Sequence, residues 1–266
     1  LIPDVNFEKI LIARKIDTDG ENGKVLTANI SKITSLNVND ANLKVSDLTG
    51  IQDFTALETL SCYSASLTTL DISKNVNLVT LDCSNNKLTS LNLSKNTKLK
   101  SLDVSNNAFT SIDLSANINL TRFTASSNQF SALELSKNTA LETISLYNNK
   151  LTDLNIAKNV NLTNLTVSKN LLTSIDVSNN PSLKTIDIAE NQLTNLDFSK
   201  NPLLVTIFGS KNKLENLNIS NNVLLTSLHL QYNKLATLDI STNKVLSTAF
   251  LYDNALTSFD ISKNPE

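Results

Sequence analysis

The chain has 266 residues, 40% of them hydrophobic, which suffices for a sizeable core, and its formal net charge is −2. This balance gives no electrostatic reason to expect nucleic acid as a partner, and no stretch reaches the roughly 18 apolar residues of a membrane-spanning helix, so we expect no membrane insertion. With a single His and no Cys/His spacing of the zinc type, we expect neither an enzyme nor a cofactor.

The first 32 residues do not share the pattern of the rest. Residues 2–14, Ile-Pro-Asp-Val-Asn-Phe-Glu-Lys-Ile-Leu-Ile-Ala-Arg, predict a short amphipathic helix. An array of repeats follows, and the first coil of such an array needs its apolar end covered. We therefore interpret residues 1–32 as an N-terminal helical cap.

A polar segment follows this helix. Oxygen-bearing side chains alternate at Asp17, Asp19 and Glu21, as in calcium-binding loops. However, one extra residue precedes Gly23, and Asn29 stands about where such a loop carries a bidentate glutamate. Two interpretations remain, a calcium site at Asp17, Asp19 and Glu21 or a polar turn inside the cap, and the departures favour the turn.

Residues 33–56 form a longer, divergent repeat, and a 21-residue unit then recurs ten times over residues 57–266. Positions 1, 4, 6, 11, 14 and 16 of the unit are apolar almost throughout. Asn occupies position 19 in all ten units and position 9 in nine, Ala65 being the exception. The leucines of position 1 keep an unbroken spacing: Leu57, Leu78, Leu99, Leu120, Leu141, Leu162, Leu183, Leu204, Leu225 and Leu246.

Each unit has two similar halves. Both contain an L-x-L triplet, whose alternation is typical of a strand with one buried face, followed by a turn at Asn. We therefore predict a β-rich solenoid, a right-handed leucine-rich coil with parallel strands on both broad sides and about 4.8 Å between coils. The Asn amides are expected to satisfy buried backbone groups of the turns in their own coil and the next.

The unit L-x-x-L-x-C-x-x-N-x-L-x-x-L-D-L-x-x-N-x-x resembles the IRREKO class of bacterial leucine-rich repeats over residues 57–266. Residues 33–57, with Leu48-Thr-Gly50-Ile51, are similar to a longer internalin-style repeat. The resemblance implies a secreted or cell-surface protein that binds proteins or glycans. The chain departs from the pattern at a few positions: Ala65, Ala157, Gly209 and Ala249.

Cys62 and Cys83 both occupy position 6, on the inward side of adjacent coils. Because this column otherwise holds Val, Ala, Leu, Ile and Gly, we expect two buried, reduced thiols that act as small hydrophobic side chains. A disulfide between them is the alternative, and it would have to meet strict geometry.

Position 5 should point outward from the first strand, and it is polar in units two to seven. In the last three units it becomes aromatic, with further aromatic and amide side chains beside it. Exposed aromatic side chains on a rigid strand are typical of binding hot spots. The predicted ligand-binding residues are Phe208, His229, Phe250, Gln231, Tyr232 and Tyr252.

Two alternatives to this site and its function remain. The aromatic residues could instead be covered by a C-terminal cap or further repeats, because Glu266 is position 21 of its unit and we expect the native chain to continue. The leading hypothesis is a non-catalytic binding or adhesion module for a protein or glycan, and the alternative is a structural spacer of a cell-surface protein. A spacer needs no preferred face, so the aromatic cluster favours binding.

Overall fold

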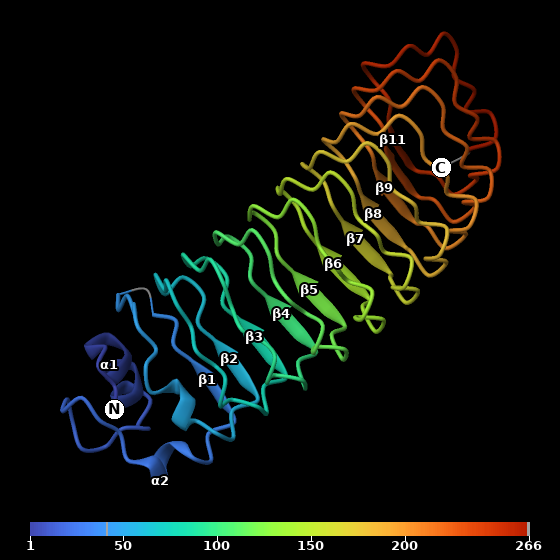
Figure 1. Cartoon of the computed structure of the whole chain (residues 1–266). Helices are drawn as coiled ribbons and strands as arrows, with labels where there is room; N and C mark the ends of the chain where they lie inside the picture. The colour runs from blue at the N-terminus through green and yellow to red at the C-terminus, as the bar shows by residue number, and fades with distance from the viewer. Residues whose placement is uncertain (41, 265–266) are drawn as a thin grey trace. The chain divides into compact units, whose positions relative to one another are not determined.

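The computed structural model describes residues 1–40 and 42–264 of the chain (Figure 1). These residues form two compact units, one from Leu1 to Gln129 and one from Phe130 onward, which are described separately. Among them, helix occurs in the first unit alone, as α1 (Val5–Ala13), α2 (Thr27–Ile30) and a short 3-10 helix, η1 (Ile51–Asp53). The predicted fold class, a leucine-rich solenoid of parallel strands with few helices, is confirmed.

Helix α1 begins where the N-terminal pattern predicted a helix. The carboxylate of Asp4 caps it by accepting hydrogen bonds from the backbone N–H groups of Asn6 (2.9 Å) and Phe7 (3.0 Å). The second carboxylate oxygen of Asp4 accepts from the N–H of Ser46 and that of Asp47. The ring of Phe7, fully buried, packs on Phe54 with 6.4 Å between centroids. A single carboxylate thus joins α1 to the divergent repeat.

One three-residue strand lies in each coil, and neighbours in the same unit pair in parallel in chain order, β1 to β5 and β6 to β11. The register repeats every 21 residues within the array, as in the pairing of His229 with Phe208 and Phe250. The strands are β1 (Ser35–Asn37), β2 (Thr59–Ser61), β3 (Thr80–Asp82), β4 (Ser101–Asp103), β5 (Arg122–Thr124), β6 (Thr143–Ser145), β7 (Asn164–Thr166), β8 (Thr185–Asp187), β9 (Thr206–Phe208), β10 (Ser227–His229) and β11 (Thr248–Phe250).

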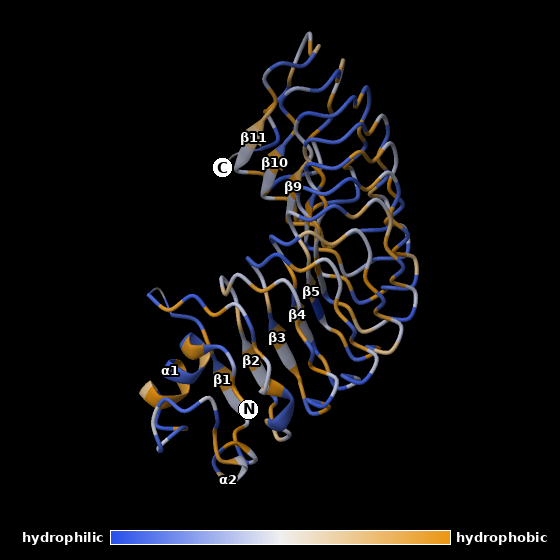
Figure 2. Cartoon of the chain, turned by 60° about the vertical axis from the view of Figure 1, so that its left-hand side comes forward, coloured by the Kyte–Doolittle hydropathy of each residue, from blue (hydrophilic) through white to orange (hydrophobic). Residues whose placement is uncertain are grey.

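The core runs through the middle of each unit, because the apolar positions of every coil point to the same side. Leucines of position 1, such as Leu78 and Leu183, are fully buried, and apolar and polar residues alternate along each coil (Figure 2). Burying each such side chain contributes about 1.5–3 kcal/mol. Position 14 is less well covered, since Leu70 and Leu196 are only half-buried.

The second broad side does not form the predicted strands. In the described residues it contributes an isolated bridge between Asp197 and Asn218, and the strands above all come from the first halves of the coils. The side chain at position 15 accepts the N–H of position 17 in its own coil, as Asp176 does from Ser178 (2.8 Å). Asp82 makes the same bond to Ser84 beside a paired strand, so this capping does not by itself account for the missing ladder.

The Asn columns satisfy backbone groups as predicted, but toward the preceding coil and not the next. The Oδ1 atom of Asn170, at position 9, accepts the N–H of Leu151 (3.0 Å), and its amide donates to the carbonyl of Leu146 (2.9 Å). At position 19, the amide of Asn201 donates to the carbonyls of Val177 and Asn180. Ala65 lacks such an amide, whereas Asn75 of the same coil donates to the carbonyls of Ile51 and Phe54 in the divergent repeat.

Candidate functional site

The three predicted strand residues lie side by side on adjacent strands. Phe208, His229 and Phe250 end β9, β10 and β11 and are direct partners in the parallel register. The ring centroids of Phe208 and His229 are 4.7 Å apart, and those of His229 and Phe250 are 4.8 Å apart. These separations follow from the interstrand spacing. We call this row of rings the aromatic strip.

Exposure rises along the aromatic strip. Phe208 and His229 are half-buried, whereas 45% of Phe250 is exposed. Burial between the two rings lowers the pKa of His229, because the charged imidazolium loses solvation. The imidazole is therefore neutral at neutral pH, and the strip presents an uncharged surface.

The hydroxyl of Ser227 lies 3.0 Å from Nε2 of His229, a contact that the sequence analysis did not anticipate. Both residues belong to β10, two positions apart, so they project from the same face of the strand. A nucleophilic serine would also need a group to orient the imidazole and donors for an oxyanion. No carboxylate hydrogen-bonds to His229 in the part of the chain that the structure describes, so this pair alone is not a catalytic arrangement.

Tyr232 and Tyr252 lie beside the strip and are 48% and 53% exposed. Their rings meet edge to face, with 5.3 Å between centroids, an arrangement that aromatic quadrupoles favour. Gln231 is half-buried, and its Oε1 atom is buried without a hydrogen-bond partner. We call Tyr232 and Tyr252 the tyrosine pair.

Tyr232 has a left-handed backbone conformation, with φ of 61°. Position 8 is left-handed in all ten units, where it is mostly a small polar residue such as Asn85, Asn148 or Asp253. Asn and Asp tolerate this conformation, whereas a bulky side chain there is strained by about 1 kcal/mol or more. The chain therefore carries an exposed aromatic ring at a position that disfavours it.

In the compact unit formed by residues Leu1–Gln129, two coils carry aspartate at position 5 where β9 to β11 carry aromatic residues. Asp82 and Asp103 are register partners on β3 and β4. Burial raises the pKa of Asp103, and repulsion from Asp82 adds to the shift. Each carboxylate also accepts an N–H of its own coil, Asp82 from Ser84 and Asp103 from Ser105. The same column is thus acidic at β3 and β4 and aromatic at β9 to β11.

The polar loop at Asp17, Asp19 and Glu21 is organised by a carboxylate of helix α1. Oε1 of the buried Glu8 accepts the N–H groups of Asn22, Gly23 and Lys24. Glu21 instead lies 3.8 Å from Lys9 at the surface. Within residues 1–40 and 42–264, no three acidic, His or Cys side chains are grouped so as to hold a metal ion. Glu8 therefore holds the backbone of residues 22–24 in place.

Both cysteines are fully buried free thiols, as the inward column predicted. Burial raises the pKa of each thiol well above its ordinary value, and for Cys83 the neighbouring Cys62 adds to the effect. The Sγ atom of Cys83 donates to the carbonyl of Asp103 at 3.6 Å. Because the thiolate is the nucleophile, both thiols are inert in the folded chain.

We expect a thiol reagent to label neither Cys62 nor Cys83 in the native protein and to label both after unfolding in guanidinium. Burial both blocks the reagent and suppresses the thiolate that reacts. The absorbance of the released chromophore, followed with and without denaturant, measures the difference. Rapid labelling of the native chain would contradict the prediction, as would an intact mass lower by two hydrogens.

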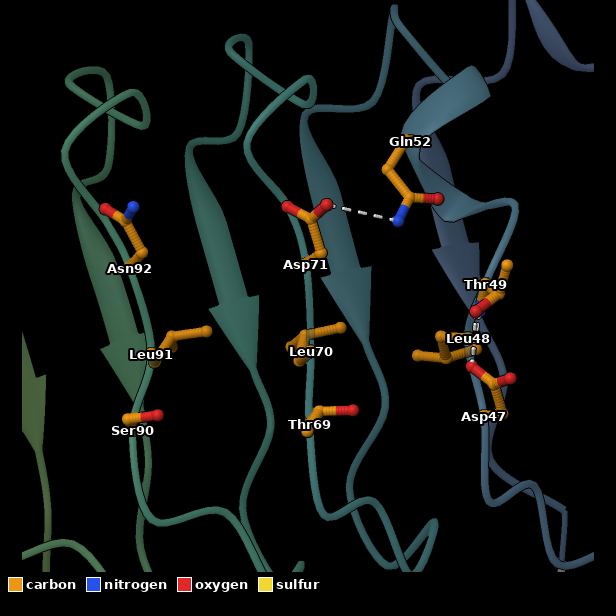
Figure 3. A pocket seen from close by; sticks show the side chains of 10 residues that line it. All are labelled: Asp47, Leu48, Thr49, Gln52, Thr69, Leu70, Asp71, Ser90, Leu91 and Asn92. Carbon is orange, nitrogen blue, oxygen red and sulfur yellow. Dashed lines mark hydrogen bonds between the residues drawn. The ribbon is translucent and has the colours of Figure 1, made fainter.

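A depression of 350 Å³ opens on the second broad side of the first unit, where Leu48, Leu70 and Leu91 lie in a row with polar side chains on both sides (Figure 3). Gln52 donates to Asp71 across it at 3.4 Å. Equivalent repeat positions form a second depression of 350 Å³ in the other unit, lined by Asn216, Leu217, Asn218, Ser220, Thr237, Leu238 and Asp239. The depression is thus a feature of the repeat that recurs at positions 13 to 15 of neighbouring coils.

Comparisons with known proteins agree with this fold. Residues 76–116 match the family model described as leucine-rich repeats in two copies. Solved structures extend the similarity to almost the whole chain. The functional domain of InlJ from Listeria monocytogenes, described as including a cysteine ladder, is 28% identical with a TM-score of 0.59, over 99% of this chain and 72% of that one.

Two further structures show the fold alone. The internalin inlF from Listeria monocytogenes is 22% identical, with a TM-score of 0.62, over 98% of this chain and 92% of its own. The leucine-rich-repeat protein LIC12759 from Leptospira interrogans is 23% identical, with a TM-score of 0.68, over 86% of this chain and 69% of its own. No curated protein matches the chain at a significant level. The chain thus has a leucine-rich-repeat coil that is similar to a bacterial internalin domain, and this fold suggests a protein-interaction module.

The described helices are short, and the longest, α1, has 9 residues. None of them has the length and apolar character needed to cross a membrane.

Proposed function

We propose that the chain is a non-catalytic binding module that recognises a protein or glycan through the outward surface of its strands. The binding residues are those of the aromatic strip with Gln231 and the tyrosine pair. The observation that carries the proposal is the continuous stack of Phe208, His229 and Phe250 on a hydrogen-bonded strand surface. Rigid, exposed aromatic side chains bind with little loss of conformational entropy.

Two further observations support a binding role over a spacer. Tyr232 presents its ring from a strained backbone position, and strain of this kind collects at functional sites. The column at position 5 also changes from Asp82 and Asp103 to aromatic residues, whereas a spacer would need no such difference between coils. The similarity to the Listeria proteins, together with the IRREKO-like unit, supports a secreted or cell-surface location.

The double variant Phe208→Ser/Phe250→Ser should keep its fold and lose its ligand. Neither ring belongs to an inward column, so thermal unfolding should shift little. Hot-spot residues contribute about 2 kcal/mol or more each, which corresponds to a loss of affinity of at least about 30-fold per ring. Glycan arrays and panels of purified surface proteins, probed with the whole chain, identify the ligand, and titration calorimetry then compares the variants.

Tyr63→Ser is the matched control, because this tyrosine is 42% exposed two residues after the end of β2, in the other compact unit. It removes an exposed aromatic ring without touching the strip. Ligand affinity that is unchanged in Phe208→Ser/Phe250→Ser, or that falls equally in Tyr63→Ser, would overturn the proposed site. A chain that binds nothing in either screen would favour the spacer.

A further inference from the structure

A second exposed apolar surface occurs in the same coils as the aromatic strip. It lies in the turns that lead into β9, β10 and β11, at positions 20 and 21 of the repeat. We call it the aliphatic ridge, and it consists of Leu203 (41% exposed), Val223 (50%), Leu224 (46%) and Val245 (39%).

At position 21, the ridge carries aliphatic residues where several other coils carry Asn. Position 21 is Asn77, Asn119 or Asn161 in other coils, and each of these amides donates to a backbone carbonyl of the preceding coil at 3.0–3.2 Å. Leu203 and Leu224 have no such donor, and they expose aliphatic surface to water instead. A contiguous exposed apolar patch of this kind marks an interaction site in a soluble protein.

The ridge leads directly into the strands that carry the strip. From Leu203 to Phe208 the chain passes directly into β9, and five residues of extended chain span about 16 Å. The half-buried Val205 and Thr206 lie between them. The same path joins Leu224 to His229 and Val245 to Phe250 in the next coils, so apolar side chains cover both ends of three neighbouring strands.

Charges around this surface are predominantly basic. Five lysines stand in the flanking turns against three carboxylates, a local balance of +2 in a chain whose formal charge is −2. One carboxylate, Glu190, already pairs with Lys211 at 3.5 Å, and another, Asp187, accepts the hydroxyl of Ser168. The lysines are Lys184, Lys211, Lys213, Lys234 and Lys244, and the third carboxylate is Asp253.

We propose that the partner at this site is a polypeptide segment with an aliphatic and aromatic face flanked by acidic residues. This inference rests on the proposed binding function and narrows its ligand class. Aliphatic side chains such as Leu203 and Leu224 have no polar atoms with which to orient sugar hydroxyls, but they pack well against the apolar side chains of a protein. The lysine margin complements a partner with Asp and Glu around its apolar face.

The double variant Leu203→Asn/Leu224→Asn tests the ridge with little risk to the fold, because the chain itself carries Asn at this position in other coils. The probe is a displayed library of short random peptides, selected on the intact wild-type chain. We expect enriched peptides that combine Leu, Ile, Phe or Trp with Asp or Glu. Their affinity should fall at least about tenfold in the Asn variant and in Phe208→Ser/Phe250→Ser.

Ile118→Asn is the matched control, because Ile118 is 56% exposed at position 20 of a coil in the first unit. It should leave peptide affinity unchanged. Peptides that need Phe208 and Phe250 but tolerate Leu203→Asn/Leu224→Asn would overturn the ridge and leave the proposed function standing. The proposed polypeptide partner would also be overturned if the selection yields no peptide while the chain binds a glycan on an array through the aromatic strip. Peptides that tolerate both double variants would overturn both proposals.

Discussion

Replacing Asn170 by alanine should lower the free energy of unfolding by about 2–6 kcal/mol. The side chain accepts the N–H of Leu151 and donates to the carbonyl of Leu146 in the preceding coil, and it also bonds carbonyls of its own coil at Val167 and Ser168. Alanine leaves at least one buried donor and one buried acceptor without a partner, and each costs about 1–3 kcal/mol. Urea denaturation followed by circular dichroism measures the change.

Asn195→Ala is the matched control for this prediction. Asn195 is an exposed residue at position 13 of a coil in the same unit, so its loss should change the free energy of unfolding by less than about 0.5 kcal/mol. Equal effects of the two substitutions would show that the Asn column does not hold the coils together. A large effect of Asn170→Ala confined to hydrogen exchange near Leu151 would instead indicate local opening of the array.

The repeating part of the fold could be predicted because each repeat position has one environment. Leu78 and Leu183 share a column, and the 21-residue period alone places both in the core. Strands on the second broad side could not be predicted correctly, because the L-x-L alternation is the same in both halves of the unit. Side-chain capping does not separate the halves either, because Asp176 caps Ser178 on the second side just as Asp82 caps Ser84 beside a paired strand.

The candidate site likewise has features that the sequence predicts and features that it does not. Stacking of Phe208, His229 and Phe250 follows from their shared repeat position and was accessible to sequence reasoning. The strain at Tyr232 could not be predicted from the sequence, because it depends on the backbone angle φ at position 8. The ridge at Leu203 could have been found from sequence, since position 21 changes from Asn to Leu, but only by comparing the turns as well as the strands.

The nonrepetitive cap was the least predictable part, because no column constrains it. Asp17, Asp19 and Glu21 have the spacing of calcium ligands, yet the partner that organises the loop is Glu8, which is distant in sequence. The buried carboxylate accepts several converging backbone N–H groups, as a bound anion does in a loop whose N–H groups point toward it. The backbone N–H groups of residues 22–24 therefore converge on the carboxylate of Glu8.

Replacing Glu8 by alanine should accordingly destabilise the first unit by about 3 kcal/mol or more. Asn22 and Gly23 would each lose the acceptor of a backbone N–H beneath helix α1, and hydrogen bonds to a charged group contribute about 1.5–3 kcal/mol each. The N–H of Lys24 would keep its bond to the side chain of Asn22 (3.0 Å). Hydrogen exchange should accelerate first in α1 and residues 22–24, and denaturant unfolding gives the size of the loss.

Glu21→Gln is the control that separates this role from calcium binding. Glu21 and Lys9 form an ion pair whose side chains are 53% and 43% exposed, and such surface pairs contribute less than about 1 kcal/mol. If Glu8 organises the loop, Glu21→Gln should leave stability nearly unchanged, with or without added calcium, while Glu8→Ala lowers it under both conditions. The opposite result would be a wild-type chain that calcium stabilises and a Glu21→Gln variant that calcium does not stabilise. That result would contradict a loop organised by Glu8 alone and would support a calcium site.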